Sequence, residues 1–269
     1  MPTVSVIIPT CNRVDSLKKS VSGVFHQTYR DFEIVVVNDG STDGTSAFLS
    51  TVQDPRFRYF EFTANRGGSV ARNEGIKNAK GDLIAFLDDD DWWEPVKLEK
   101  QVRTIQRENV GLCYTGVTKR TLRGKLNRYI FMSPRFSDVY KSIMFVNFFG
   151  TTSSIMVKKE LLEQTGGFDP ALPALQDWDL YIRLLKNGCT IYGIDEPLVH
   201  YNIINNAQNV SGSFSRFKTA AGYLQEKYRD FEYFHLFKRR LVYIERLRYF
   251  KSRPFLLDAI AYYVRHSFK

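Results

Sequence analysis

Short apolar runs alternate with amphipathic segments along the first 118 residues of the chain. The apolar runs are rich in Val, Ile and Phe, which predicts buried strands at residues 4–8, 32–37, 57–62, 83–87 and 110–118. The segments between them predict helices: the first is capped by Asp15 or Ser16 and runs to about residue 26, and the others lie at residues 45–51, 70–79 and 95–108. This alternation indicates βαβ units and a mostly parallel sheet.

The second half of the chain is less regular. Residues 119–135 are basic and typical of a hairpin or a loop. Further on, we expect helices at residues 138–145, 159–164 and 177–186, and short strands at residues 152–157, 191–194 and 198–201. From residue 214 onward the pattern predicts helices, with a last one after Pro254 and with apolar residues at helical spacing at Phe234, Phe237, Leu241 and Ile244.

Composition adds a boundary. The chain has 269 residues, 43% of them hydrophobic, and a net charge of +9. Residues 213–269 carry 13 Lys and Arg against 5 Asp and Glu, so nearly all of the excess charge lies there. We therefore expect a domain at residues 1–212 and a basic amphipathic helical tail at residues 213–269.

The tail allows more than one role. Its basic face suits an anionic membrane surface. Alternatively, its aromatic stripe packs on the preceding domain and the basic face is only hydrated, or the same helices form a homodimer interface. The sequence does not decide among these.

Cysteine usage indicates the compartment. Cys11, Cys113 and Cys189 have no metal-site spacing, which indicates a reducing environment. Met1 leads straight into the first predicted strand without a basic leader, and no apolar run is long enough to span a bilayer. We expect a cytoplasmic protein, with peripheral attachment to the inner face of the cell membrane if the tail binds lipid.

The strongest chemical signal is the run Asp88-Asp89-Asp90-Asp91, directly after the predicted strand at residues 83–87. Four adjacent carboxylates repel one another unless a counter-charge is present. Mg²⁺ and Mn²⁺ prefer such oxygen ligands, and Mg²⁺ is commonly held by one or two carboxylates plus substrate phosphates. The alternative is a solvated acidic turn. A nucleic-acid partner is disfavoured, because an acidic cleft repels phosphates.

Other polar groups also follow predicted strands. Thr10, Asn12 and Arg13 follow the first strand and Asp39 the second, so we expect them at one edge of the sheet beside the aspartates. Arg72 lies in the helix after Arg66. It suits a phosphate contact, and the alternative is a surface salt bridge.

Six blocks in order resemble the family-2 glycosyltransferases. The blocks are Ser5-Val6-Ile7-Ile8-Pro9-Thr10-Cys11-Asn12-Arg13, Val36-Val37-Asn38-Asp39-Gly40-Ser41-Thr42-Asp43, Asn65-Arg66-Gly67-Gly68-Ser69-Val70-Ala71-Arg72-Asn73, Leu87-Asp88-Asp89-Asp90-Asp91, Gly166-Gly167-Phe168-Asp169 and Gln176-Asp177-Trp178-Asp179-Leu180. The fourth block is similar to the family's DxD motif. Together the blocks cover about residues 3–202 and leave the tail unexplained.

The resemblance implies a GT-A fold: a Rossmann-like, mostly parallel mixed α/β sheet flanked by helices, here with a C-terminal helical extension. The nucleotide-binding half would end at about residue 118, and the acceptor-binding half would occupy residues 119–212. The resemblance also implies an inverting, metal-dependent transfer from a nucleotide-diphosphate sugar, most often a UDP-sugar, to a hydroxyl of a glycan or lipid-linked saccharide in cell-surface polysaccharide biosynthesis. The cofactor would be Mn²⁺ or Mg²⁺.

Residue roles carry over by position. Nucleotide contacts would come from Pro9, Thr10, Arg13, Asp39, Arg72, Asp88 and Asp89. Within this set, Asp39 would accept a hydrogen bond from the uracil imide; its alternative role is an Asx turn. Asp90 would bind the metal with Asp88, and Asp91 is a candidate helper.

Asp177 is the candidate general base, because the reaction needs a carboxylate on the acceptor side to take the hydroxyl proton. Its alternative role is a helix cap. Asp179 is expected to be structural, and Trp178 to stack on a sugar or pack in the core. Gln176 stands where many relatives carry Glu. The Arg and His that many relatives carry after the final Tyr are missing here, and His200 is expected to be a packing residue.

Other function classes remain as alternatives. The processive-synthase pattern Gln-x-x-Arg-Trp is absent, which favours one sugar per encounter. A non-catalytic nucleotide-sugar or glycan-binding module and a sugar nucleotidyltransferase are the competing readings. The second would need a glycine-rich phosphate loop after the first strand, where Pro9-Thr10-Cys11-Asn12-Arg13 has no glycine.

Overall fold

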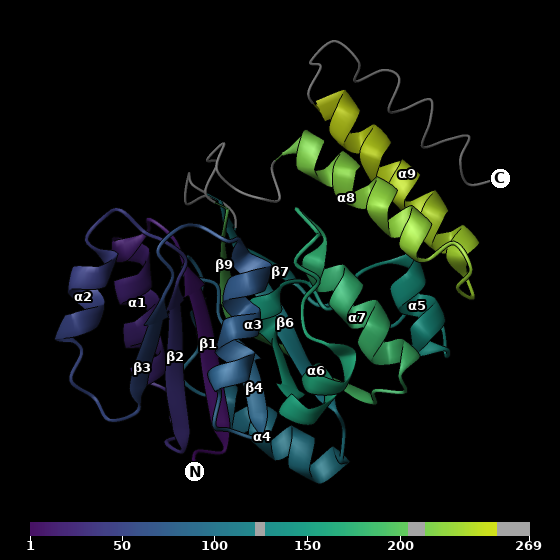
Figure 1. Ribbon diagram of the computed structural model, residues 1–269. Helices are drawn as coiled ribbons and strands as arrows, with labels where there is room; N and C mark the ends of the chain where they lie inside the picture. Colours follow the sequence, from purple (N-terminus) through teal and green to yellow (C-terminus); the bar gives the residue numbers. More distant parts are fainter. Residues whose placement is uncertain (122–126, 204–212, 252–269) are drawn as a thin grey trace.

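The computed structural model describes residues 1–121, 127–203 and 213–251. The described strands form one mixed sheet in the order β3-β2-β1-β4-β8-β6-β9-β5, with β7 paired to β6 (Figure 1). Their bounds are β1 Val4–Thr10, β2 Phe32–Asn38, β3 Phe57–Glu61, β4 Leu83–Phe86, β5 Trp92–Trp93, β6 Leu112–Thr121, β7 Asn127–Ile130, β8 Ile155–Lys158 and β9 Ile191–Ile203.

Helices flank the sheet, as the sequence predicted. Their bounds are α1 Val14–Phe25, α2 Thr45–Thr51, α3 Gly68–Asn78, α4 Lys97–Glu108, α5 Val139–Phe145, α6 Lys159–Thr165, α7 Gln176–Lys186, α8 Phe214–Lys227 and α9 Phe234–Lys251, with a 3₁₀ turn at Thr152–Ser154. No helix within these described ranges combines the length and apolar character needed to cross a membrane.

The sheet divides two apolar cores. Along β1, Val6 and Ile8 pack into one core with α1, α2 and α4, whereas Ile7 packs into the other with α3 and α5 to α9. This follows from the two-residue period of a strand, which points alternate side chains to opposite faces. The strands β1 to β4 pair in parallel, and β8 then enters antiparallel between β4 and β6. The predicted mixed α/β architecture is therefore confirmed.

Some predicted element ends were wrong. The first helix begins at Val14, and its amide is capped by the distant Asp43 (N···Oδ2 3.1 Å) rather than by Asp15 or Ser16. The strand β5 was not predicted; it pairs with β9 through Trp92 and Trp93. The two expected strands near residue 200 are one strand, β9, whose irregular register against β6 accommodates Pro197.

The aromatic stripe of the tail packs on the domain. Phe217, Leu224, Tyr228, Phe237 and Leu241 are buried in the same core as α5 and α7, and Figure 1 shows α8 and α9 side by side next to these helices. This confirms that the aromatic stripe of α8 and α9 packs on the domain, and it does not test what their basic face contacts. The expected helix after Pro254 lies outside the described residues.

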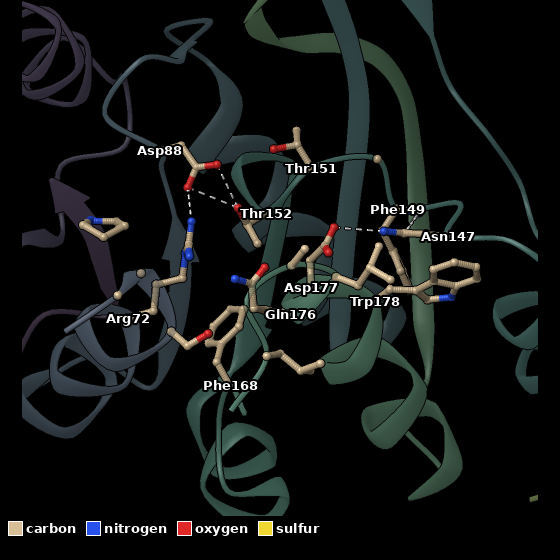
Figure 2. Close-up of a pocket in the computed structure, with 18 of the residues that line it drawn as sticks. Arg72, Asp88, Asn147, Phe149, Thr151, Thr152, Phe168, Gln176, Asp177 and Trp178 are labelled. Carbon is tan, nitrogen blue, oxygen red and sulfur yellow. Dashed lines mark hydrogen bonds and ion pairs between the residues drawn. The ribbon is translucent and has the colours of Figure 1, made fainter. Parts of the chain in front are cut away.

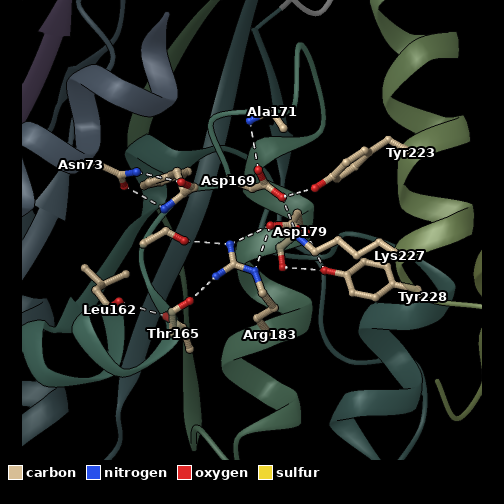
Figure 3. Close-up of polar contacts among 12 residues, drawn as sticks. Asn73, Leu162, Thr165, Asp169, Ala171, Asp179, Arg183, Tyr223, Lys227 and Tyr228 are labelled. Atoms are coloured by element: carbon tan, nitrogen blue, oxygen red, sulfur yellow. Dashed lines mark hydrogen bonds and ion pairs between the residues drawn. The ribbon is translucent and has the colours of Figure 1, made fainter. Parts of the chain in front are cut away.

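A polar cluster fixes α8 to α7 (Figure 3). Asp179 is fully buried; its Oδ1 accepts hydrogen bonds from Lys227 Nζ at 2.7 Å and the Tyr228 hydroxyl at 2.6 Å. Its Oδ2 accepts from Arg183 Nε at 2.9 Å and Nη2 at 2.6 Å. Asp169 accepts from Lys227 as well, at 2.7 Å. Asp179 is therefore structural, as expected.

Candidate active site

The carboxyl ends of β1, β2 and β4 open onto a cleft of about 1160 Å³. Thr10 pairs with Asn38, and Ile7 with Phe86, so the residues after these strands meet at one edge of the sheet. Segments around α5 and α7 and residues of α8 and α9 complete the walls. The cleft brings together all the predicted site residues: Pro9, Thr10, Arg13, Asp39, Arg72, Asp88, Asp89, Asp90 and Asp177.

Asp88 forms a partly buried ion pair on the cleft wall (Figure 2). Arg72 Nη2 lies 2.5 Å from Asp88 Oδ1, and the Thr152 hydroxyl donates to the same carboxylate at 3.2–3.3 Å. Burial alone would lower the pKa of Arg72, but the charge and hydrogen bond of Asp88 raise it above the usual arginine value. With 15% of its side chain exposed, Arg72 is not the surface salt bridge that the sequence left open.

Asp89 and Asp90 share one guanidinium. Arg13 Nη1 lies 2.9 Å from Asp89 Oδ1 and 3.0 Å from Asp90 Oδ2, while the Thr10 hydroxyl donates to Asp89 Oδ2 at 2.7 Å. Burial, reinforced by the charges of Asp88 and Asp89, raises the pKa of Asp90 to about 6 in spite of Arg13. A shift in this direction means that one arginine does not fully compensate the local negative charge.

Asp91 lies in the interior. Its side chain is buried, and its Oδ2 accepts a hydrogen bond from the Ser153 hydroxyl at 2.6 Å. Its backbone carbonyl accepts from the Ser20 hydroxyl at 2.8 Å, which ties the aspartate run to α1. Asp91 is therefore a structural residue of the aspartate run. Its buried position does not support the expectation that it helps to bind the metal.

Asp39 links two of the sequence blocks. Its carboxylate accepts the backbone N–H of Arg66 at 2.6 Å and that of Gly67 at 2.9 Å, just before α3. The side chain that bonds locally within this turn is Asn38, whose Oδ1 accepts from Ser41 N, three residues on, at 3.1 Å. Gly67 has a φ of +93°, which lets its N–H point at Asp39 at little steric cost. Asp39 thus fixes the loop at Arg66 and Gly67, directly before α3, the helix that contains Arg72.

Asp177 faces the cleft from the first turn of α7 (Figure 2). The N-cap residue is Leu175, and the Asp177 carboxylate accepts backbone N–H groups of Trp178 and Asp177 in the first turn. Leu175 has a φ of +62°, an unfavourable conformation for a leucine. Asn147 Nδ2 donates to Asp177 Oδ2 at 3.0 Å. Burial raises the pKa of Asp177, with the nearby backbone N–H groups and the Arg72 charge opposing it. A raised pKa brings a carboxylate closer to the range of an effective base.

The rings of Trp178 and His200 are both held by contacts within the protein. Trp178 is buried, donates from Nε1 to the Ile143 carbonyl at 2.7 Å and packs edge-on against Phe237, which confirms its core role. His200 stacks on Trp92 with ring centroids 4.8 Å apart, and its Nε2 lies 2.6 Å from Glu94. The packing role expected for His200 is confirmed.

The carboxylate oxygens of the aspartate run are the candidate ligands for a divalent metal. The part of the chain that the structure describes has no group of three or more His, Cys, Asp or Glu able to hold an ion alone. Asp88 and Asp90 nevertheless both line the cleft, where burial and then the charges of Asp88 and Asp89 raise the pKa of Asp90 to about 6. Two carboxylates suffice where substrate phosphates complete the coordination. The residues therefore fit a divalent cation held jointly with a diphosphate.

Sequence reasoning missed three polar residues that shape the site. Asn147 contacts Asp177, Thr152 contacts Asp88, and Asn73 exchanges two hydrogen bonds with the backbone of Phe168 at 2.7 and 2.8 Å. The last pair joins α3 to the Gly166-Gly167-Phe168-Asp169 block 95 residues away. Membership of a recognisable block was the only signal for Asn73, and Asn147 and Thr152 had none.

The chain was then compared with known proteins. It matches the family model described as glycosyl transferase family 2 over residues 5–166. It is 32% identical over 250 residues to TuaG of Bacillus subtilis (strain 168), named as a teichuronic acid biosynthesis glycosyltransferase, covering 91% of this chain and 94% of TuaG. It is 29% identical over 192 residues to Escherichia coli WfaP, named UDP-Glc:alpha-D-GlcNAc-diphosphoundecaprenol beta-1,3-glucosyltransferase, covering 70% and 72% of the two chains.

Solved structures show the same fold. S. aureus TarS 1–349 in complex with UDP-GlcNAc matches with a TM-score of 0.70 at 19% identity, covering 93% of this chain and 73% of TarS 1–349. The mannosyltransferase PcManGT from Pyrobaculum calidifontis, in complex with GDP-Man and Mn²⁺, matches with a TM-score of 0.64 at 22% identity, covering 91% and 69%. The fold is the GT-A type that the sequence blocks implied. The chain belongs to glycosyl transferase family 2, and it is an inverting glycosyltransferase.

Proposed function

We propose that the protein transfers one sugar from a UDP-sugar to a hydroxyl of a glycan or lipid-linked saccharide in cell-surface polysaccharide biosynthesis, with Mn²⁺ or Mg²⁺ as cofactor. One observation carries the proposal: Asp88, at the end of β4, and Asp177, at the start of α7, face the same cleft (Figure 2). The first suits a metal-bound diphosphate and the second suits an acceptor hydroxyl.

The named relatives support the choice of donor and pathway. UDP-Glc appears in the name of WfaP, and TarS 1–349 was solved with UDP-GlcNAc. PcManGT was solved with GDP-Man and Mn²⁺, which supports a divalent metal and keeps a guanine nucleotide as the second candidate. The teichuronic acid role in the name of TuaG supports a cell-surface polysaccharide as the product.

We assign the donor nucleotide to the β1 and β2 end of the cleft. Pro9, Thr10 and Arg13 border the base and ribose, and Asp89 holds Thr10 and Arg13 in place besides reaching the nucleotide. Asp39 retains acceptor capacity for the uracil imide, because each of its oxygens accepts one backbone N–H and a carboxylate offers about four lone-pair sites. Arg72 meets the diphosphate beside Asp88 and Asp90. A bound divalent ion would neutralise the charge on the leaving diphosphate.

Asp177 acts as the general base in this proposal. Its carboxylate takes the proton of the acceptor hydroxyl as that oxygen forms a bond to C1 of the sugar. The bond between C1 and the diphosphate oxygen breaks, its electron pair leaves with UDP, and the single displacement inverts the anomeric carbon. Asn147 orients the carboxylate by donating to Oδ2.

The alternatives make different predictions. Family membership counts against a sugar nucleotidyltransferase. A non-catalytic binding module would have no use for a carboxylate whose pKa is raised beside an empty acceptor position, yet Asp177 has these properties. A module of that kind would bind a nucleotide sugar without turnover.

Calorimetry of UDP, GDP and dTDP, each with Mn²⁺ and with a chelator, tests the donor assignment. We expect metal-dependent UDP binding that Asp90→Ala removes. Binding of GDP or dTDP instead would overturn the donor, and an equal UDP affinity in chelator would overturn the metal site. Failure of every nucleotide to bind folded protein would favour the binding module for another ligand.

We further propose that the basic face of α8 and α9 rests on an anionic membrane, which places the enzyme at the inner face of the cell membrane. Lys218, Lys238 and Arg239 are exposed there, although the opposite faces of the helices are buried. Deleting the tail would uncover the core, so charge substitution is the sharper test. Co-sedimentation with phosphatidylglycerol vesicles should fall when these three become Gln, whereas equal loss in a control variant would contradict the proposal. The control replaces three exposed lysines on other helices or beside them, Lys19, Lys77 and Lys80.

A homodimer through the same face is the competing outcome. Analytical ultracentrifugation of the wild type without lipid distinguishes the two, since a membrane-binding face predicts a monomer and a dimer face predicts a concentration-dependent dimer that the triple substitution dissociates.

A further inference from the structure

The charges that line the cleft are unevenly placed. Its acidic residues, which are Asp39, Asp88, Asp89, Asp90 and Asp177, all come from strand ends and the start of α7. The tail helices add four residues to the lining, Arg216 and Phe217 from α8 and Arg240 and Ile244 from α9. The tail therefore contributes two cations and no acid to a cavity whose other lining residues include five aspartates and four cations, Arg13, Arg66, Arg72 and Lys119.

Of the other three arginines on the cleft wall, two are paired with acids, and Arg66 lies over the Phe62 ring. Arg13 is paired with Asp89 and Asp90, and Arg72 with Asp88. Among the described residues, neither Arg216 nor Arg240 has a carboxylate within salt-bridge distance, although α8 and α9 also carry Glu226 and Glu245. Arg216 is exposed and hydrated, whereas Arg240 is partly buried, so Arg240 is the guanidinium that an anion brought by a ligand would suit best.

Arg240 provides a second, independent observation. Its Nε is buried from solvent and has no hydrogen-bond partner within the described part of the chain. Its guanidinium lies 5.1 Å from the Tyr243 ring, which orients the planar group without satisfying its N–H donors. A buried donor without an acceptor is costly, so a ligand oxygen at this place would gain a strong charge-assisted bond.

The surroundings of the arginines are apolar. Phe217 and Ile244 stand next to them on the cleft wall, and Met132, with 36% of its surface exposed, lines the same cavity. Two guanidinium groups beside apolar side chains suit a ligand in which an anionic group is attached to a hydrocarbon. The cleft volume also exceeds the roughly 300–1,000 Å³ typical of a single small-molecule site, which leaves room for an acceptor beside the donor.

We propose that Arg216 and Arg240 form an anion subsite that binds a phosphate group of the acceptor. The inference rests on the proposed function, because it takes the α7 side of the cleft as the acceptor side. Arginine forks match phosphate oxygens bidentately, and two of them suit a diphosphate. The phosphate belongs either to the diphosphate of a lipid-linked saccharide or to a phosphate within a glycan. The tail helices are then part of the acceptor site and not only a support for it.

Titration calorimetry with soluble probes tests this subsite. The probes are octyl diphosphate below its micelle concentration and inorganic pyrophosphate, both in EDTA so that the metal-dependent donor site is silent. Arg216→Gln/Arg240→Gln is compared with a control of equal charge on α1 and α3, Lys19→Gln/Lys77→Gln, whose exposed side chains do not line the cleft. UDP with Mn²⁺ is titrated into each protein separately.

We expect the wild type to bind octyl diphosphate and the arginine variant to bind it at least about tenfold more weakly, while the lysine variant stays within about twofold. Tighter binding of octyl diphosphate than of pyrophosphate would identify the lipid-linked source, and equal binding would identify a glycan phosphate. No binding by the wild type, equal affinity in the arginine variant, or equal loss in the lysine variant would each overturn the subsite.

The UDP titrations separate this proposal from the one it rests on. Unchanged UDP binding in the arginine variant shows that its donor half is folded and intact. Loss of the diphosphate probe with UDP retained assigns the effect to the subsite. Probe binding by a wild type that fails to bind UDP would leave the subsite standing and overturn the donor assignment.

Discussion

Asp177 and Asp179 lie two residues apart on α7 and have opposite surroundings. Both oxygens of Asp179 are occupied by Arg183, Lys227 and Tyr228, and its side chain is fully buried (Figure 3). Asp177 accepts one side-chain hydrogen bond, from the neutral amide of Asn147, and faces the cleft (Figure 2). Two aspartates in one helical turn thus have different surroundings: the carboxylate of Asp179 is hydrogen-bonded within the protein on both oxygens, and that of Asp177 faces the cleft.

The difference separates stability from chemistry. A carboxylate whose lone pairs are all used by protein donors holds elements together and has little capacity left for a substrate. A carboxylate enclosed without a cation in direct contact has a raised pKa, which brings it closer to the range of a base. Adjacent acids in a motif therefore have to be assigned by their partners, since their positions in sequence do not distinguish them.

The largest stability effect should come from Asp179. Asp179→Asn removes the counter-charge of Arg183 and Lys227 and should lower the free energy of unfolding by about 3–5 kcal/mol, as is typical for breaking a buried ion pair. Urea denaturation measures the loss. Glu226→Gln is the control, because Glu226 pairs with Arg229 on the surface and its loss should change stability little. Equal losses of stability in the two variants would contradict the structural role of Asp179.

Lys97 is another buried ionisable residue, and it lies away from the cleft. It is fully buried, its Nζ donates to the neutral Gln101 Oε1 at 2.6 Å, and burial lowers its pKa to about 7. Between this value and 10.5 the unfolded chain binds more protons than the folded one, so this group makes stability rise with pH across that window.

Lys97→Met should therefore stabilise the protein at pH 7 by roughly 1–4 kcal/mol, the range found when buried charges are replaced by apolar residues. The advantage over the wild type should shrink as the pH approaches 10. Chemical denaturation at several pH values tests this, and a difference that does not depend on pH would contradict the lowered pKa.

Asn147 should affect turnover without affecting the fold. Asn147→Ala removes the amide that orients Asp177 and stabilises its charged form, so kcat should fall by about tenfold and the pKa of Asp177 should rise. The acid limb of kcat/KM then moves to higher pH while UDP affinity is kept. A fall in kcat with an unmoved acid limb would make Asn147 merely structural.

Local signals predicted most of the fold. The run at residues 83–87 is apolar throughout, and that at residues 32–37 is apolar except for Glu33, because both faces of these strands are covered; the helix at Thr45–Thr51 has the expected bounds. What failed depended on distant partners. Val14 is capped by Asp43, and β5 exists only because Trp92 and Trp93 pair with β9. A single sequence contains no pattern for such pairings.

In the candidate site, too, the sequence predicted the motif residues but not the contacts that depend on distant partners. The motif residues were predicted to share one cleft, and they do. The interior position of Asp91 and the capture of Asp39 by the Arg66 and Gly67 amides could not be read from an acidic run or a turn pattern. The contribution of α8 and α9 to the cleft was also out of reach, because their basic and aromatic composition suits a membrane, a dimer or a packed helix equally well.

Turnover of Asp177→Asn, with UDP affinity and unfolding free energy measured on the same protein, tests the account most directly. The substitution keeps the shape of the side chain and removes the base. The account predicts a fall in kcat of about 10²–10⁴-fold, with metal-dependent UDP binding and stability close to the wild type. Near-normal kcat would contradict the assignment of Asp177, and a loss of stability like that of Asp179→Asn would show that the two carboxylates do not differ in role.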